Sequence, residues 1–152
     1  MASTPVNIRS ATPEDASVIA QFNIAMARET GDKALDEATV RAGALGVIED
    51  ASRGFYLIAQ DSDSVVGALL VTREWSDWRN GDLWWIQSVY VSPASRRQGV
   101  FRALYEAVVC RAKESAVRGI RIYVEHENET AKAVYKSLQM TQTPYQVFER
   151  ML

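Results

Sequence analysis

The chain has 152 residues, 47% of them hydrophobic, which suits one ordinary domain with a buried core. Its 17 lysines and arginines are balanced by 19 aspartates and glutamates, a net charge of -2 that argues against a nucleic-acid partner. The single cysteine excludes an intramolecular disulfide and fits a reducing cytoplasm. With no secretion signal at its start and no apolar run near the roughly 20 residues of a membrane helix, we expect a cytoplasmic protein without membrane contact.

The first third of the chain predicts a short strand and two helices. The strand covers residues 6–9, and a helix then opens at Thr12 and Pro13, residue types that suit an N-cap and a first helical turn. This helix extends to about residue 29. A second helix is predicted over 36–50 from apolar residues at helical spacing.

Three strand-like segments follow and predict an antiparallel meander. Residues 54–60 and 65–75 flank a turn-rich Asp and Ser stretch, which is typical of a hairpin. Asn80 and Gly81 lie in a second polar turn that leads into a third strand over 83–92.

The remaining elements are predicted as helix 99–116, strand 119–125, helix 128–140 and a final strand 143–151. The first two of these, with strand 83–92, form a β-α-β crossover, so their strands should be parallel. The expected fold class is α/β, an α+β mixed sheet with helices on both faces, in the order β-α-α-β-β-β-α-β-α-β. We expect a single domain over 1–152, because no repeat, linker or low-complexity tract interrupts the chain.

The chain lacks the residues for a metal cluster or a nucleophilic triad. His126 is the only histidine and Cys110 the only thiol, so zinc sites, Cys-His pairs and Ser-His-Asp triads lack parts. We interpret His126 as solvated or hydrogen-bonded, and Cys110 as a core residue of an apolar helix. We therefore expect no metal.

The junction between strand 83–92 and helix 99–116 carries the tightest basic cluster, formed by Arg96, Arg97 and Arg102 around Gln98 and Gly99. A helix start collects unpaired N–H groups and positive potential, which favours phosphate binding. The alternative is a solvated basic cap on an ordinary crossover helix. This is not a Walker loop, since no Gly-Lys-Ser/Thr follows.

Three segments carry a family resemblance. SVYVSPASRRQGV, IRIYVEHEN and NETAKAVYKSLQM occur in this order, and any one alone would be weak. Together they resemble the GNAT superfamily of acyl-CoA-dependent N-acyltransferases, with Arg96 to Phe101 matching the Arg-x-x-Gly-x-Gly/Ala signature for pyrophosphate. The likeness in element order covers nearly the whole chain.

The resemblance implies a binding site for acetyl-CoA as co-substrate. Backbone groups around Val89 and Val91 would pair with the pantetheine arm, because this strand splays from its parallel neighbour in the family. The pyrophosphate would contact the junction and the start of its helix, at Arg96, Arg97, Gln98, Gly99, Val100, Phe101 and Arg102. Phe101 departs from the signature, so its ring must point away or narrow the site.

The resemblance also implies that Tyr135 protonates the departing thiolate as a general acid. The alternative is a packing tyrosine on an amphipathic helix. Asn128 would cap that helix and lie beside the pantetheine, although capping alone would explain it. Gln139 stands where this helix commonly ends in glycine, which leaves its end less defined.

The general base is open. Relatives often carry a glutamate where this chain has Gln87, which cannot accept a proton. The remaining candidates are a water chain, a partly neutral substrate, or one of Glu29, Glu74, Asp77 and Glu127.

The four tryptophans, Trp75, Trp78, Trp84 and Trp85, lie together where relatives build the acceptor pocket. With Glu74 and Asp77 they could receive a cationic amine; strand packing or a homodimer contact are the alternatives. The leading hypothesis is an acetyltransferase acting on a small-molecule or peptide amine, in a ternary complex. A non-catalytic acyl-CoA-binding regulatory module is the second.

Overall fold

The computed structural model describes residues 5–31 and 33–152. The predictions on the secretion signal and on the domain 1–152 fall partly on residues 1–4 and 32, which lie outside the described residues. The chain forms two compact units, Met1–Ile122 and Tyr123–Leu152.

The first unit holds a five-stranded sheet in the spatial order β1-β2-β3-β4-β5. Its elements are β1 (Asn7–Ser10), the 3-10 turn η1 (Pro13–Asp15), α1 (Ala16–Gly31), α2 (Glu37–Ile48), β2 (Gly54–Asp61), β3 (Ser64–Ser76), β4 (Gly81–Val91), the 3-10 turn η2 (Pro93–Ser95), α3 (Val100–Glu114) and β5 (Gly119–Ile122). The predicted elements of this unit are confirmed, with β5 ending three residues earlier than predicted.

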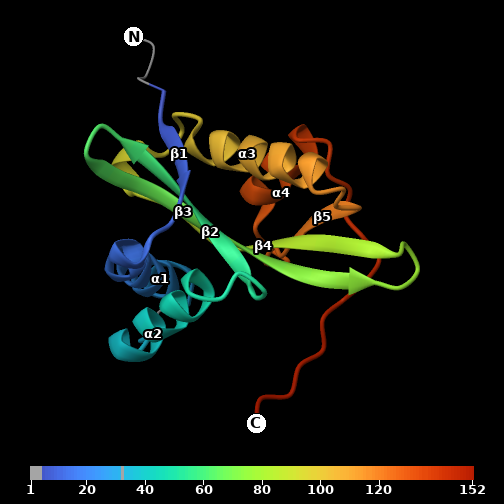
Figure 1. Ribbon diagram of the computed structural model, residues 1–152, viewed down its shortest axis with the longest axis horizontal. Coiled ribbons are helices and arrows are strands. Elements are labelled where there is room, and N and C mark those ends of the chain that lie inside the picture. The colour runs from blue at the N-terminus through green and yellow to red at the C-terminus, as the bar shows by residue number, and fades with distance from the viewer. Residues whose placement is uncertain (1–4, 32) are drawn as a thin grey trace. The chain divides into compact units, whose positions relative to one another are not determined.

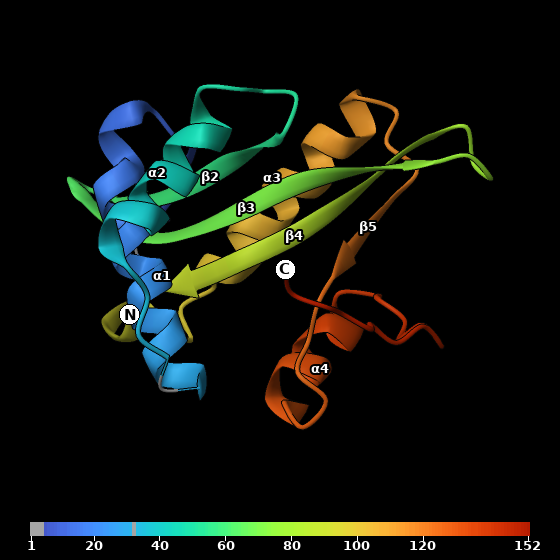
Figure 2. The same ribbon diagram turned by 90° about the horizontal axis from the view of Figure 1, so that it is seen from below.

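The strand pairing has one parallel step. The strands β1 to β4 pair as antiparallel neighbours, and β4 pairs with β5 in parallel. The predicted meander, crossover and mixed sheet are therefore confirmed. The parallel pairing is short, because only Leu83–Ile86 of β4 lies opposite Gly119–Ile122, the whole of β5 (Figure 2). Among the described residues, the part of β4 after Ile86 has no strand partner on its β5 side.

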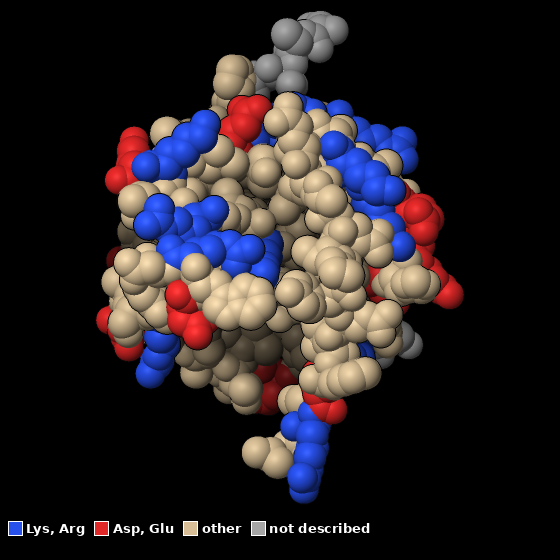
Figure 3. Space-filling model, turned by 90° about the vertical axis from the view of Figure 1, so that its right-hand side faces the viewer, with Lys and Arg blue, Asp and Glu red and all other residues tan. Residues whose placement is uncertain are grey.

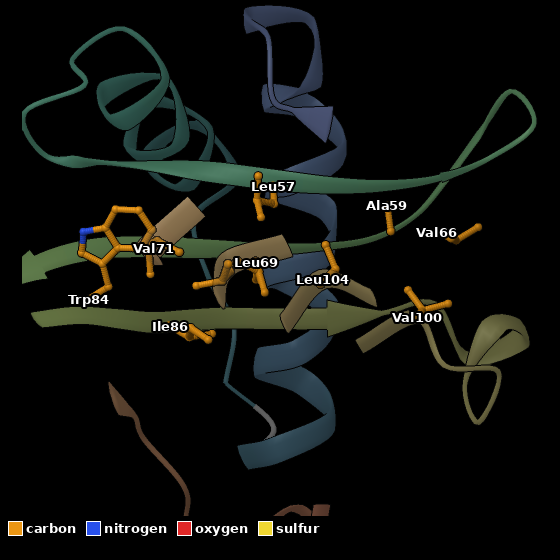
Figure 4. Close-up of a cluster of buried hydrophobic side chains, with 11 residues drawn as sticks. Leu57, Ala59, Val66, Leu69, Val71, Trp84, Ile86, Val100 and Leu104 are labelled. Atoms are coloured by element: carbon orange, nitrogen blue, oxygen red, sulfur yellow. The ribbon is translucent and has the colours of Figure 1, made fainter. Parts of the chain in front are cut away.

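Helices cover both faces of this sheet, as predicted (Figure 1). The α3 face holds the larger core, in which Leu57, Leu69, Ile86 and Leu104 are fully buried (Figure 4). The opposite face packs against α1 and α2 through a second cluster: Ala16, Ile19, Ala44, Tyr56, Ile58 and Ala68. Because side chains alternate along a strand, the central strands β2 and β3 contribute to both clusters.

Local polar contacts set where the first helices begin. Thr12 precedes η1, and its backbone N–H donates to Asp15 Oδ2 at 2.7 Å. The same carboxylate accepts hydrogen bonds from both terminal nitrogens of Arg9, at 2.8 and 2.9 Å. These bonds lower the pKa of Asp15, the Arg9 hydrogen bond being the largest cause. The side chain of Asp36 caps α2 by accepting from the backbone N–H of Thr39.

The second unit contains α4 (Glu129–Ser137). Asn128 is its N-cap and accepts from Ala131 N at 3.0 Å, so the predicted cap is confirmed. At the other end Gln139 adopts a left-handed φ of 67°, and Met140 N donates to Tyr135 O at 3.0 Å. This is a Schellman-type ending in which glutamine takes the position that glycine usually fills.

Two sequence predictions are wrong. Residues 143–151 form no strand. A strand needs a ladder of backbone partners, and this segment has none among the described residues, while Pro144 supplies no N–H donor. Cys110 is exposed rather than buried, because it lies off the α3 stripe of Leu104, Val108 and Ala112 that faces the core.

His126 is exposed, as predicted. No helix within the described ranges combines the length and hydropathy that a bilayer crossing requires. In the same part of the chain, no three His, Cys, Asp or Glu side chains gather as a metal ion would require.

Candidate active site

A bulge interrupts the pairing of β4 with β3 near the end of β4. Ala68 of β3 lies opposite Tyr90, whereas Leu70 lies opposite Gln87, so Ser88 and Val89 are skipped in the pairing. Ser88 has a positive φ of 50°, uncommon for a residue other than glycine. Bulges re-aim the backbone and often occur beside active sites. Here the bulge lies beyond Ile86, the last residue of β4 that pairs with β5.

The loop between β4 and α3 ends in two left-handed residues. Arg97 has a φ of 63° and Gly99, the N-cap of α3, a φ of 81°. A Cβ added at Gly99 would meet no heavy atom within 4 Å, so this side of the backbone is open. Gly99 has no side chain to cap the first N–H groups of α3, which lack intrahelical acceptors. The geometry leaves room for an anion at the helix start.

Arg96 does not extend toward that space. Its Nη2 donates to both Glu29 carboxylate oxygens, at 3.2 and 3.0 Å, and its Nε donates to Val91 O at 2.9 Å. The guanidinium also lies 5.3 Å from the ring centroid of Tyr90, whose hydroxyl donates to Glu29 Oε1 at 3.4 Å. Arg96 thus joins the loop to α1. Among the described residues, Arg97 and Arg102 are the arginines of the junction that have no carboxylate partner.

This arrangement escaped the sequence reasoning. Glu29 and Arg96 are 67 residues apart, and no spacing pattern links them. Tyr90 is buried and packs against Phe22, with the rings tilted by 35° and their centroids 5.1 Å apart. Burial, followed by the negative charge of Glu29, raises the pKa of Tyr90. Side chains alternate between the two faces of β4, and this alternation was the one sequence signal that could have placed Tyr90 on the face toward α1.

The remaining predicted residues of the junction differ in exposure. Arg97, Gln98 and Arg102 are exposed, and Gln98 Nε2 donates to Ala94 O at 3.2 Å. Val100 is buried in the core, so only its backbone can contact a ligand. The ring of Phe101 lies against Tyr105 one turn along α3, with centroids 6.2 Å apart.

The polar side chains of β3, β4 and β5 form a polar strip on the sheet face opposite α3, comprising Thr72, Glu74, Trp85, Gln87 and Arg121. Gln87 Nε2 donates to Thr72 Oγ1. Glu74 accepts from Trp85 Nε1 at 3.1 Å and from Arg121 Nη1 at 2.9 Å. The structure brings these five residues together from three strands.

The candidate bases are mostly engaged or exposed. Glu29 pairs with Arg96 and Glu74 with Arg121, while Asp77 and Glu127 are exposed. The four tryptophans also separate: Trp84 is buried in the α3 core, Trp85 belongs to the polar strip, and Trp75 and Trp78 are exposed.

Tyr135 lies in α4 of the second unit and is partly buried. Burial raises the pKa of its hydroxyl above the ordinary value near 10. The phenol is therefore protonated at neutral pH and able to donate a proton.

Comparison with known families decides the membership. A sequence model described as "Acetyltransferase (GNAT) family" matches residues 20–139. The chain belongs to the GNAT acetyltransferase family. A solved structure, a possible acetyltransferase from Clostridium difficile 630, is 39% identical with a TM-score of 0.89, and the match covers 98% of this chain and 99% of that one. No curated protein matches.

More distant solved GNAT-like structures share the fold. A predicted acetyltransferase with acetyl-CoA from Clostridium acetobutylicum is 17% identical, with a TM-score of 0.81 and coverage of 95% and 96%. An aminoglycoside acetyltransferase from an uncultured soil metagenomic sample is 16% identical, with a TM-score of 0.76 and coverage of 98% and 99%.

The charged surface is mixed: on the face in Figure 3, basic side chains are interspersed with acidic and uncharged ones.

Proposed function

We propose that this GNAT protein is an N-acetyltransferase, which moves the acetyl group of acetyl-CoA to a primary amine of a small molecule or peptide. The observation that carries the proposal is the open helix start at Gly99, which a short loop joins to a strand whose end is not paired with β5. A pyrophosphate can approach such backbone N–H groups closely, and the helix dipole favours its charge.

The proposed co-substrate site combines backbone and charge. The phosphates would lie at the N–H groups of Gly99, Val100, Phe101 and Arg102, with Arg97 and Gln98 beside them. Arg96 would act by holding the loop to Glu29 rather than by contacting phosphate. A structural neighbour with the same fold was solved with acetyl-CoA, which agrees with this choice of ligand.

The pantetheine arm would pair with β4 at its open edge. The skipped residues Ser88 and Val89 have backbone groups outside the β3 pairing, and these can bond to an amide or polarise a thioester carbonyl. At Val91 the carbonyl already accepts from Arg96 Nε. Its contact with the arm would have to use the second lone pair of that oxygen or displace Arg96.

The chemical step would be direct attack in a ternary complex. The amine nitrogen bonds to the acetyl carbon, and the carbon–sulfur bond breaks. Tyr135, which is protonated at neutral pH, then gives its proton to the thiolate and regains one from water. The extra amine proton passes to water, since Gln87 has no basic group and both Glu29 and Glu74 are paired. Asn128 would hold the start of α4 and lie beside the sulfur.

A second candidate is a non-catalytic module that binds acyl-CoA and regulates something else. It is favoured by one observation, the Gln87 amide bonded to Thr72 where relatives often have a carboxylate. Such a module would use the same junction without needing Tyr135.

A thiol-release screen separates the two candidates. The full chain is mixed with acetyl-CoA and a panel of primary amines that includes amino acids, polyamines, aminoglycosides and peptides. Amine-dependent release of free coenzyme A supports the transferase. Saturable acetyl-CoA binding without release above background for any amine supports the binding module.

A further inference from the structure

The polar strip contains a guanidinium with unused binding capacity. Arg121 of β5 lies opposite Trp85 of β4, and Glu74 reaches them from β3. These side chains share the face opposite the α3 core, because the neighbouring residues Trp84 and Ile86 point into that core. Arg121 and Glu74 are partly buried, with 27% and 40% of their side chains exposed.

Glu74 and Arg121 differ in how many of their hydrogen-bonding groups are used. Both oxygens of Glu74 accept a bond, one from Trp85 Nε1 and one from Arg121 Nη1. Among the described residues, that bond to Glu74 is the one hydrogen bond that the Arg121 guanidinium donates. A guanidinium carries five N–H donors in a planar fork. Glu74 therefore orients Arg121, and Arg121 keeps donors for a further anion.

The ring of Trp85 helps to fix this orientation. The Arg121 guanidinium lies 5.8 Å from the ring centroid, within cation–π range. A guanidinium held from two sides loses little freedom when it binds a carboxylate in a bidentate manner. The strip then continues along β4 to Gln87, the residue before the bulge at Ser88.

From this geometry we propose that Arg121 binds a carboxylate of the acetyl acceptor. The inference rests on the proposed function, and it narrows the acceptor to amines that carry a carboxylate several atoms away from the amine. The amine would lie toward Gln87 and the bulge, and the carboxylate toward β5. Two or three residues of strand separate these positions, about 7–10 Å along β4. Amino acids with a side-chain or terminal amine span such a distance.

The test uses matched pairs of acceptors. The panel contains the standard L-amino acids and a series from β-alanine to 6-aminohexanoate, each paired with its carboxamide. For every pair, kcat/KM with acetyl-CoA and calorimetric binding to the full chain are measured. We expect at least one carboxylate to be preferred over its carboxamide by roughly 10- to 100-fold, the usual worth of a charge-assisted pair.

Variants assign that preference to a residue. Arg121→Gln should abolish it, and Arg121→Lys should retain part of it, since lysine keeps the charge but not the fork. The matched control is Arg73→Gln, which removes an arginine that lies over Trp84 of the α3 core. The control should keep the full preference.

Two results would overturn the inference: no carboxylate binds or reacts better than its carboxamide, or the preference survives Arg121→Gln. Acetyl-CoA binding is measured in the same samples. If acetyl-CoA binds but carboxylates are not preferred, only the acceptor inference fails. If the wild type does not bind acetyl-CoA, the proposed function itself fails.

Discussion

The two compact units of this chain keep their residues in place by different means. In the sheet-containing unit, Leu57, Leu69, Ile86 and Leu104 are wholly buried between strands and α3. In the unit Tyr123–Leu152, which is described throughout, no residue of α4 is buried. That helix is defined instead by its ends, the Asn128 cap and the left-handed Gln139.

The difference suggests how stability and chemistry are divided. Burial of apolar surface is the largest favourable term in folding, so most of the folding free energy should come from the first unit. The proposed ligand contacts of that unit use backbone atoms held by the core. The proposed proton donor, Tyr135, belongs to the unit without a buried core, where changes can alter turnover at small cost to stability.

The largest effect should come from opening the core. Leu104→Ala should lower the free energy of unfolding by about 3 kcal/mol, because it leaves a cavity between α3 and the sheet. The comparison variant Val134→Ala, on an exposed position of α4, should change it by less than about 0.5 kcal/mol. Urea unfolding followed by circular dichroism measures both. Equal losses would break the contrast between the units.

The second effect concerns catalysis in the second unit. Tyr135→Phe should lower turnover roughly 10²-fold, the usual worth of general acid catalysis. Acetyl-CoA affinity and melting temperature should hardly change, because the ring is kept. An amine found by thiol release serves as acceptor, with the exposed Tyr145→Phe as control. Unchanged turnover would remove Tyr135 from the mechanism, and a large loss of binding would make it structural.

Features that depend on neighbouring residues could be predicted from the sequence, whereas contacts between distant residues could not. The β4–α3 junction could be predicted because its features are local: strand, turn, Gly99 and helix follow one another within a few residues. The N-caps Thr12 and Asn128 are local as well. The terminal strand was wrong because residues 143–151 have strand-like composition, whereas a strand also needs a partner that composition does not supply.

Long-range side-chain contacts could not be predicted. Glu74 and Arg121 are 47 residues apart, and their contact depends on the register of two strand pairs. The bond between Arg96 and Glu29 depends on how α1 packs on the sheet. The sequence assigned Arg96 to phosphate from its charge and its place in the family signature, whereas the structure gives that charge a carboxylate partner.

A smaller effect should sharpen the account of the first unit. Asp15 is buried and bonded to Arg9, so Asp15→Asn should cost about 2 kcal/mol at neutral pH. Its pKa is depressed in the folded state. The stabilisation should therefore be complete above the unfolded pKa, about 4, and disappear as pH falls through the folded value. Unfolding curves from pH 7 to 2 should show the variant converging on the wild type. At pH 7 the control Asp77→Asn, at an exposed position, should unfold like the wild type.

The smallest effect concerns the end of α4. Gln139→Gly should stabilise this helix end by about 0.5 kcal/mol, because glycine adopts the left-handed conformation without a steric penalty. Amide hydrogen exchange at residues 135–140 would report it, with Gln142→Gly as control. Faster exchange in Gln139→Gly than in the wild type would mean that the glutamine side chain contributes more than its backbone strain costs.

The central claim is that acyl-CoA binds at the junction between β4 and α3, and calorimetry with acetyl-CoA tests it most directly. Gly99→Val places a side chain in the open space at the helix start, and Gly43→Val adds the same side chain at an unobstructed position of α2. Circular dichroism first establishes that both variants are folded. The account predicts saturable binding by the wild type and by Gly43→Val, and at least about tenfold weaker binding by Gly99→Val. Absence of saturable heat for the wild type, or equal affinity of a folded Gly99→Val, would contradict it.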